Sequence, residues 1–299
     1  MINALIKNIR TASDFSSDNE VTLFRKMATE LLKKSKGIFI DETHGRVCNV
    51  TFESIRDKTE TCEISDLLII TTDKKKNISR ATFCQAKKES NSSWINNATA
   101  SSIPQSCFDF KGQFNQWELL SYRPEVGSVG GFTPPKTLLS SFDSPSIGSF
   151  GVFYTYSGNL ELNYSVAEFI TSTLPAKSIK SKAPQTKMHI NGKLSKYDYN
   201  TKRGNIYEKI VCENIHDFFS SLMSNKIGAI IDTDKSEHKW LINYVKTQVS
   251  NSENIVYGNN SQDFNGYFFP NIKIDDNKDN YLSGEFSILV LDTTETAQI

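Results

Sequence analysis

The stretch CEISDLLIITTDKKKNISRATFCQAKKE, from Cys62 to Glu89, decides the fold of this chain. Its apolar run from Leu67 to Ile70 is typical of a buried strand, and a second apolar stretch covers residues 81–86. The polar segment 73–77 between them predicts a turn. Two buried strands joined by a polar turn indicate an antiparallel hairpin, and we interpret the rest of the chain outward from it.

Three polar residues lie at one end of this hairpin. Asp66 stands where the first strand begins, and Gln85 and Lys87 stand where the second one ends. In an antiparallel pair, the start of one strand lies beside the end of the next. Side chains at positions i and i+2 share a face, so Gln85 and Lys87 point the same way. A carboxylate, an amide and an ammonium are therefore expected to converge at one corner of a sheet.

An Asp, a hydrophobic strand and then Gln-x-Lys resemble the metal-dependent nuclease core of the PD-(D/E)xK superfamily. The pattern is closest in type to the Gln-x-Lys variants found in Mrr-like restriction endonucleases and in nuclease domains of bacterial anti-phage defence systems. Two residues depart from the motif: Ser65 replaces its Pro, and Gln85 stands where the family name has Asp or Glu. The second departure removes one negative charge from the site.

The resemblance covers roughly residues 16–156 and implies both a fold and a reaction. The fold is α/β with a restriction-endonuclease-like core, in which helices flank a mixed central sheet, followed by a C-terminal α/β extension. The reaction is hydrolysis of phosphodiester bonds, for which divalent ions supply Lewis-acid stabilisation and an activated water. The cofactor implied is Mg²⁺ or Mn²⁺, and Mg²⁺ prefers oxygen ligands.

The resemblance also assigns roles within the site. Asp66 would be the bridging carboxylate, and Glu20, on the preceding helix, would be the second ligand. The side-chain carbonyl of Gln85 or the main-chain carbonyl of Ala86 would complete the protein's share. Lys87 would hold or activate the attacking water and steady the phosphate.

A simpler interpretation accompanies each of these residues. Glu20 falls in the first turn of a helix that we expect to begin after Ser17 or Asp18, where the helix dipole favours a carboxylate without any further role. The polar ends of the hairpin could be ordinary solvated positions, with Lys87 and Lys88 in water. His44 has no second His or Cys at ligand spacing and is expected to be a turn residue.

Charge is balanced overall but uneven along the chain. Lys and Arg number 34 and Asp and Glu number 34, which argues against a broad coat on nucleic acid. Residues 171–203 are nonetheless rich in lysine, whereas residues from 272 onward are acidic. The basic segment is either a phosphate-contacting surface or a solvated connector. The candidate nucleic-acid-binding residues are Lys88, Lys177, Lys180, Lys182 and Lys187.

The remaining pattern predicts the organisation of the chain. We expect residues 1–175 to form the nuclease core, 176–203 a basic connector and 204–299 a C-terminal α/β region. That last region is either a second small unit or an addition that widens the first sheet. Expected helices cover residues 105–120, 166–174, 206–223 and 240–249, and expected strands cover 37–41, 47–52, 150–156, 227–231, 254–257 and 285–291.

Composition limits the compartment and the partners. The chain has no apolar run long enough to cross a membrane and no signal-peptide pattern, which predicts a cytoplasmic protein. Its 5 cysteines are scattered singly, so Cys62 and Cys84 are expected to be small core residues and not a disulfide. No Walker-type motif is present, so a partner protein would supply any ATP-driven step or sensing. A homo-oligomer remains open.

Three functions are compatible with these features. The first is a metal-dependent deoxyribonuclease that serves as the effector of a bacterial anti-phage defence or restriction system. The second is a non-cleaving nucleic-acid-binding or scaffolding subunit of such a system. The third is a structural α/β protein without a nucleic-acid partner. The sequence does not separate DNA from RNA as the substrate.

Overall fold

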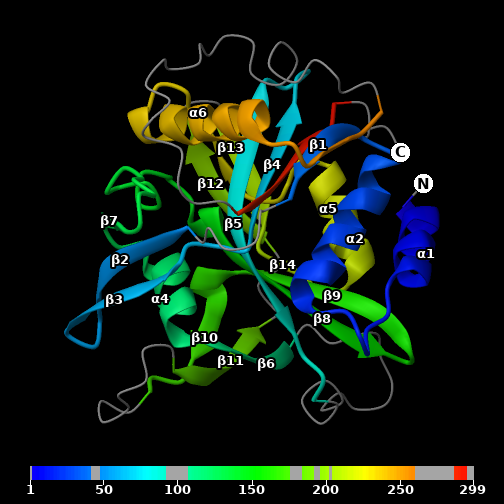
Figure 1. Cartoon of the computed structure of the whole chain (residues 1–299), viewed down its shortest axis with the longest axis horizontal. Helices are drawn as coiled ribbons and strands as arrows, with labels where there is room; N and C mark the ends of the chain where they lie inside the picture. The colour runs from blue at the N-terminus through cyan, green and yellow to red at the C-terminus, as the bar shows by residue number, and fades with distance from the viewer. Residues whose placement is uncertain are drawn as a thin grey trace.

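The computed structural model describes residues 2–41, 48–91, 107–175, 184–191, 196–201, 204–259 and 286–294, and the statements below concern these residues. The chain forms a mixed α/β structure built around one large sheet (Figure 1). Helices cover both faces of this sheet, and smaller sheets lie beside it.

Nine strands of the described chain form the main sheet, in which β4 pairs in parallel with β17, β5 pairs in parallel with β8, and all other pairs are antiparallel. Every residue of β4 and β17 is buried, as expected for central strands covered on both faces. In spatial order the strands are β14 (Val211–Cys212), β9 (Asn159–Val166), β8 (Gly148–Tyr156), β5 (Ile78–Lys88), β4 (Leu67–Asp73), β17 (Ser287–Asp292), β1 (Lys36–Ile40) and β16 (Ile255–Tyr257), with β15 (Ala229–Ile230) also on β5.

One face of the main sheet carries α1 (Ile2–Ala12), α2 (Glu20–Leu32) and α5 (Ile215–Met223), which lie together in Figure 1. Apolar side chains repeat at helical spacing along α2, and Phe24 packs edge-on against Phe153 of β8 at 4.9 Å between ring centroids. Phe150 of the same strand points to the opposite face and packs against Phe110 at 5.8 Å. The two faces therefore have separate aromatic clusters.

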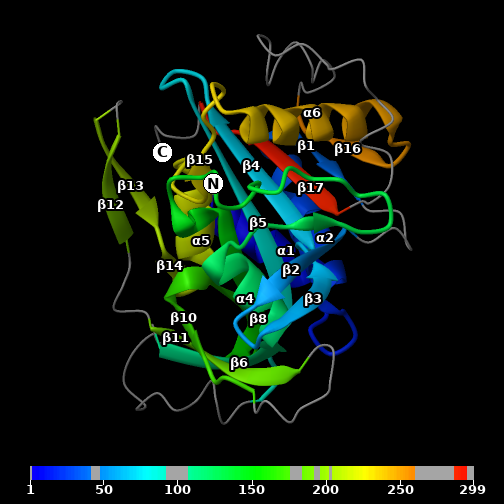
Figure 2. The same ribbon diagram turned by 90° about the vertical axis from the view of Figure 1, so that its left-hand side faces the viewer.

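The other face carries α4 (Phe114–Tyr122) and α6 (Ser236–Asn251). Tyr244 of α6 packs on Phe286 at 5.1 Å, and Phe286 in turn meets Phe83 of β5 at 5.7 Å. Because Phe83 and its neighbour Cys84 point to opposite faces of β5, this cluster lies across the sheet from α2. The view turned by 90° shows α6 across the top of the main strands and α4 below it (Figure 2).

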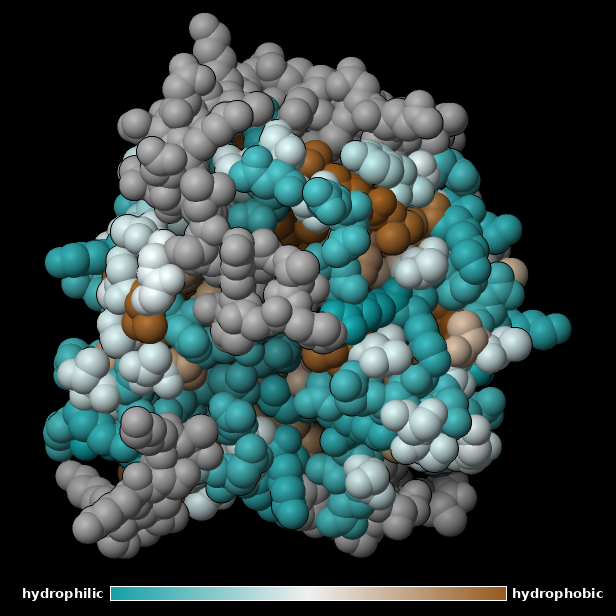
Figure 3. All heavy atoms as spheres, in the orientation of Figure 1, coloured by the Kyte–Doolittle hydropathy of each residue, from teal (hydrophilic) through white to brown (hydrophobic). Residues whose placement is uncertain are grey.

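Three smaller sheets complete the fold. Figure 2 shows β12 and β13 as a hairpin along one side of the molecule. The face seen in Figure 3 is mostly hydrophilic where the structure describes it, with apolar side chains gathered near β4 and β1. The first of these sheets contains β10 (Ile170–Ser172), β11 (Gln185–Asn191) and β6 (Cys107–Gln113), and the second contains β3 (Lys58–Glu63), β2 (Asn49–Ser54) and β7 (Gly127–Ser128). The third is the hairpin of β12 (Lys196–Thr201) and β13 (Gly204–Lys209). Two 3₁₀ helices, η1 (Pro145–Ile147) and η2 (Ala167–Phe169), lie in the connections.

The predicted hairpin is confirmed. Strands β4 and β5 pair antiparallel, with Leu67 opposite Cys84 and Asp73 opposite Ile78. The turn between them includes Asn77 at φ 50°, a left-handed conformation that Asn tolerates better than most residues. The helix after Asp18, the strands at 150–156, 254–257 and 285–291, and the helix at 240–249 are also present, within a few residues of their expected bounds.

Three predicted helices are wrong in whole or in part. Residues 107–113 are the strand β6, in which Phe108 and Phe110 alternate with outward polar residues, and only the part from Phe114 is helical. Residues 166–174 contain the end of β9, η2 and β10 in place of a helix. Residues 206–212 belong to β13 and β14, and α5 starts only after Asn214, whose side chain accepts from the Asp217 N–H as an N-cap. Apolar spacing alone did not separate strand from helix in these short stretches.

The segment expected to be a connector contains β11, whose residues pair with β6 from Gln185↔Gln113 to Asn191↔Cys107. A loop is therefore wrong for residues 185–191. Of the two alternatives for the C-terminal third, the structure shows addition to the first sheet, because β14, β15, β16 and β17 all join it. β17 is not an edge addition, since it lies between β4 and β1.

Cys62 and Cys84 are buried free thiols, as expected for small core residues. Burial raises the pKa of Cys84 to about 12, which keeps it in the unreactive thiol form. His44 lies outside the described residues. Among the described helices, none combines the length and the apolar composition needed to cross a bilayer.

His238 makes the stability of the fold depend on pH. Its ring is 1% exposed, lies 3.8 Å from the Phe142 ring and accepts the Asp232 N–H at Nδ1. Burial and the nearby Lys235 lower its pKa to about 4, despite Asp232, Glu237 and Asp143. Since the unfolded chain titrates near pH 6.5, the neutral ring contributes stability above that pH, and this is lost as the pH falls toward 4.

We expect the wild-type free energy of unfolding to fall by on the order of 2 kcal/mol more than that of His238→Gln between pH 6.5 and pH 4. Urea unfolding of both proteins at a series of pH values measures the difference. Parallel pH profiles for the two proteins would show that His238 does not titrate in this way.

Candidate functional site

The β4–β5 hairpin brings Asp66, Gln85 and Lys87 to one corner of the main sheet. Asp66 immediately precedes β4, and its Oδ2 accepts the Ala86 N–H at 2.6 Å. This bond fixes the carboxylate against the end of β5. The opposite edge of β5 pairs in parallel with β8. The predicted convergence of Asp66 with the end of the second strand is thus present in the structure.

The three side chains also meet one another. Lys87 Nζ lies 3.9 Å from Asp66 Oδ2 and 3.4 Å from Gln85 Oε1. The side chains of Lys87 and Asp66 are 15% and 19% exposed, so water reaches them from one side only. Gln85 donates through Nε2 to the Glu63 carbonyl at 3.5 Å, which turns its Oε1 toward Lys87. Gln85 is fully buried and its Oε1 accepts from Lys87, whereas the Asp66 carboxylate is partly exposed.

Ala86 also has a place in this arrangement. Within a strand, the N–H and C=O of one residue point to the same neighbour. The Ala86 N–H is directed at Asp66, so its carbonyl lies on the same side of β5. The role of this carbonyl as a ligand stays a prediction.

Glu20 stands at the first position of α2. The helix begins at Glu20, and Asn19, not Ser17 or Asp18, is its N-cap, with Oδ1 accepting the Thr22 N–H at 2.8 Å. The charge of Glu20 acts weakly on Asp66 and raises the pKa of that carboxyl group. The structure therefore brings Asp66, Gln85 and Lys87 together, and the place of Glu20 among the ligands stays a prediction.

The electrostatic balance of Asp66 reflects this crowding. Burial raises the pKa of Asp66 above its usual value, and the charge of Glu20 raises it further. The Lys87 ammonium and the Ala86 N–H act in the opposite direction, although burial prevails. A cation bound beside Asp66 would stabilise the ionised form of this carboxyl group.

The oxygen donors at this corner suit a hard divalent cation. Two carboxylates and one amide oxygen match the ligands that Mg²⁺ prefers, and protein sites for Mg²⁺ commonly use one or two carboxylates. Within the described parts of the chain, no group of three or more His, Cys, Asp or Glu side chains is arranged to hold a metal ion. The metal-binding role of this corner stays a prediction.

Lys88 has a different environment from the one we expected. Its Nζ donates to the Asp18 carbonyl at 2.8 Å and lies 4.6 Å from the centre of the Phe15 ring. Asp18 is itself held by Lys26 at 2.6 Å and by the N–H of Asp14. In the structure Lys88 thus anchors the segment that leads into α2 and Glu20.

Among the other basic candidates, the structure describes only Lys187. Lys177, Lys180 and Lys182 lie outside the described residues. Lys187 is on the outward face of β11, where its Nζ pairs with Asp109 at 2.6 Å. It lies opposite Lys111 in the β6–β11 pair, in a sheet separate from the one that carries the Asp66 corner. Its part in nucleic-acid binding stays a prediction.

Glu89 is a residue that the sequence did not single out. It is 6% exposed, and its carboxylate accepts the N–H groups of Asn91 at 2.7 Å and Lys111 at 3.1 Å. These bonds tie the end of β5 to β6 and so help to fix Lys87, two residues earlier. The alternation Gln85, Lys87, Glu89 in the sequence was the available signal for it.

Comparison with known proteins gives no relative for this chain. No protein-family model, no curated protein and no solved structure matches it.

Proposed function

We propose that this chain is a divalent-metal-dependent nuclease that hydrolyses phosphodiester bonds of DNA. The observation that carries this proposal is the meeting of Asp66, Gln85 and Lys87 at one half-buried corner, with Lys87 Nζ 3.9 Å from Asp66 Oδ2 and 3.4 Å from Gln85 Oε1. The arrangement agrees with the Asp and Gln-x-Lys pattern of the PD-(D/E)xK superfamily, and Glu20 adds a second carboxylate.

Each residue has a separate task in this proposal. Asp66 and Glu20 would hold Mg²⁺ or Mn²⁺ through carboxylate oxygens, with Gln85 Oε1 or the Ala86 carbonyl as a neutral ligand. A bound ion of this kind supplies Lewis-acid stabilisation of phosphate charge and a lowered pKa for a coordinated water. Lys87 orients the attacking water and contacts the phosphate through its compact ammonium group.

The biological setting follows from the same resemblance. Gln-x-Lys nucleases of this type serve in restriction and anti-phage defence, so we propose the role of an effector nuclease in such a system. RNA is the alternative substrate. A partner protein would provide ATP hydrolysis or sensing, because the sequence has no Walker-type motif.

A non-cleaving nucleic-acid-binding or scaffolding subunit is the second candidate. The replacement of a carboxylate by Gln85 favours it, since the site then has only two formal negative charges. The presence of Lys87 beside Asp66 favours cutting, because a scaffold has no physical need for a partly buried ammonium at this corner.

Incubation of the purified protein with supercoiled plasmid and, separately, with single-stranded RNA tests the proposal. Millimolar Mg²⁺ or Mn²⁺ should convert the plasmid to nicked and linear forms, and chelator should stop the reaction. Binding of DNA without chelator-sensitive cutting would favour the scaffolding subunit. Neither binding nor cutting of either nucleic acid would contradict both proposals.

The position of Lys88 leads to a further expectation within this site. Lys88→Met removes the ammonium from the Asp18 carbonyl, so the start of α2 and with it Glu20 is held less firmly. We expect several-fold weaker Mn²⁺ binding, because a ligand that must be ordered on binding contributes less. Lys34→Met, at an exposed lysine just beyond α2, is the matched control. Equal Mn²⁺ affinities of Lys88→Met and the wild type would remove this positioning role.

A further inference from the structure

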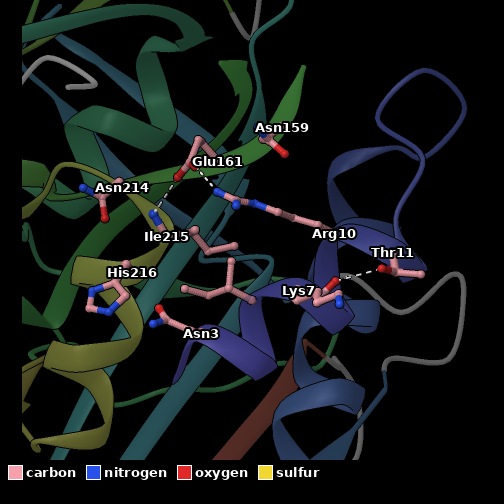
Figure 4. A pocket seen from close by; sticks show the side chains of 10 residues that line it. Asn3, Lys7, Arg10, Thr11, Asn159, Glu161, Asn214, Ile215 and His216 are labelled. Atoms are coloured by element: carbon pink, nitrogen blue, oxygen red, sulfur yellow. Dashed lines mark hydrogen bonds and ion pairs between the residues drawn. The ribbon is translucent and has the colours of Figure 1, made fainter. Parts of the chain in front are cut away.

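A separate cavity of about 730 Å³ opens between α1, the start of β9 and the start of α5 (Figure 4). None of its lining residues belongs to the Asp66 corner. Its size is in the range of pockets that bind small molecules, roughly 300–1,000 Å³. Its polar rim is formed by Asn3, Lys7, Thr11, Asn159, Asn214 and His216.

An ion pair crosses the cavity. Arg10 reaches from α1 to Glu161 of β9, and its Nε donates to the Leu160 carbonyl at 3.1 Å. The other oxygen of Glu161 accepts the Ile215 N–H at 3.1 Å. Both carboxylate oxygens of Glu161 therefore have a partner, Arg10 for one and the Ile215 N–H for the other, and the side chain is only 9% exposed. Its negative charge is largely neutralised within the protein and does not repel an anionic ligand.

The other side chains of the lining that a ligand can contact are cationic or polar. Among the described residues of the lining, Glu161 is the only acidic one, and it is paired with Arg10. Lys7 is an additional cation on the exposed side of α1. His216 stands across the opening from Lys7, on α5 (Figure 4). Three asparagine amides supply both donors and acceptors around them. Such a lining disfavours a cation or an apolar molecule.

The inner side of the cavity offers little apolar surface. Ile6 and Ile215 line it, but they are only 5% and 1% exposed, so contacts with a ligand come mainly from the polar groups. A cation and several amides around a cavity of this size suit a small molecule with an anionic end and a hydrogen-bonding body, and a phosphorylated metabolite such as a mononucleotide has both.

We propose that this cavity binds a phosphorylated small molecule of mononucleotide size, with its phosphate at Lys7 and His216. The inference is independent of nuclease activity, because binding is measured directly and none of the residues involved belongs to the metal site. Lys7 is exposed and has no part in the core, so its replacement should leave the fold intact.

Calorimetric titration of the full chain with AMP, adenosine and inorganic phosphate tests this proposal. We expect saturable binding of AMP, and binding of adenosine weaker by about tenfold or more, since a charge-assisted hydrogen bond is lost. Lys7→Met and His216→Ala should each weaken the binding of AMP by a similar factor. Lys239→Met, at an exposed lysine of α6, is the matched control and should bind AMP as the wild type does.

Several results would overturn the proposal. Absence of AMP binding, or equal binding of AMP and adenosine, would remove recognition of the phosphate. Unchanged AMP affinity in both Lys7→Met and His216→Ala would show that binding occurs elsewhere. Equal thermal midpoints of these variants and the wild type without ligand serve to confirm that they are folded.

Discussion

Asp66→Asn should abolish cleavage while leaving the protein folded. The substitution keeps an oxygen that can accept the Ala86 N–H, so the hairpin loses little, but it removes the charge that would bind the metal. Lewis-acid stabilisation is worth several kcal/mol, and each 1.36 kcal/mol is a factor of ten in rate. We therefore expect plasmid nicking to fall by about a thousandfold or more.

The folded state of Asp66→Asn is checked by its thermal midpoint. Because burial already disfavours the ionised Asp66, a neutral amide should fold at least as stably as the carboxylate. Glu53→Gln, at an exposed glutamate of β2, is the matched control and should cut as the wild type does. Undiminished nicking by purified Asp66→Asn would remove Asp66 from the mechanism.

Lys87→Ala should separate turnover from metal binding. A positioned ammonium that assists proton transfer and phosphate binding contributes about 100-fold or more to the rate. An ammonium does not ligate a metal, and its removal takes away a positive charge 3.9 Å from Asp66. We expect nicking to fall by about 100-fold or more and Mn²⁺ affinity to stay equal or increase.

Two further variants sharpen the test of Lys87. Gln85→Glu restores a carboxylate of nearly the same shape and should tighten Mn²⁺ binding. Lys76→Ala, in the turn at the other end of the hairpin, leaves the corner untouched and should behave as the wild type. If Lys87→Ala lost Mn²⁺ as completely as Asp66→Asn, the division of roles between the two residues would be wrong.

The hairpin and its corner could be predicted because the information is local. Asp66 and Lys87 lie at the same end of a hairpin whose two strands are joined by a short turn. Strand alternation alone then sets which side chains share a face. The same alternation shows that Lys88 points away from Lys87, which agrees with its contact to Asp18 on the α2 side. The role of Lys88 in nucleic-acid binding stays a prediction.

The sheet order could not be predicted from local patterns. The run that becomes β17 is apolar enough to be recognised as a strand, but nothing near it indicates that it pairs with β4, more than two hundred residues earlier. Strand β6 was missed because Phe108, Phe110 and Phe114 fit helical spacing as well as alternation. The position of Glu20 relative to Asp66 depends on how α2 packs against the sheet, which only the resemblance suggested.

Titration of the wild-type protein with Mn²⁺, followed by the loss of the free-ion paramagnetic resonance signal, tests the central claim most directly. The proposed site predicts saturable binding that Asp66→Asn abolishes, Glu20→Gln weakens and Glu53→Gln leaves unchanged. Absence of saturable Mn²⁺ binding, or wild-type affinity in Asp66→Asn, would contradict it.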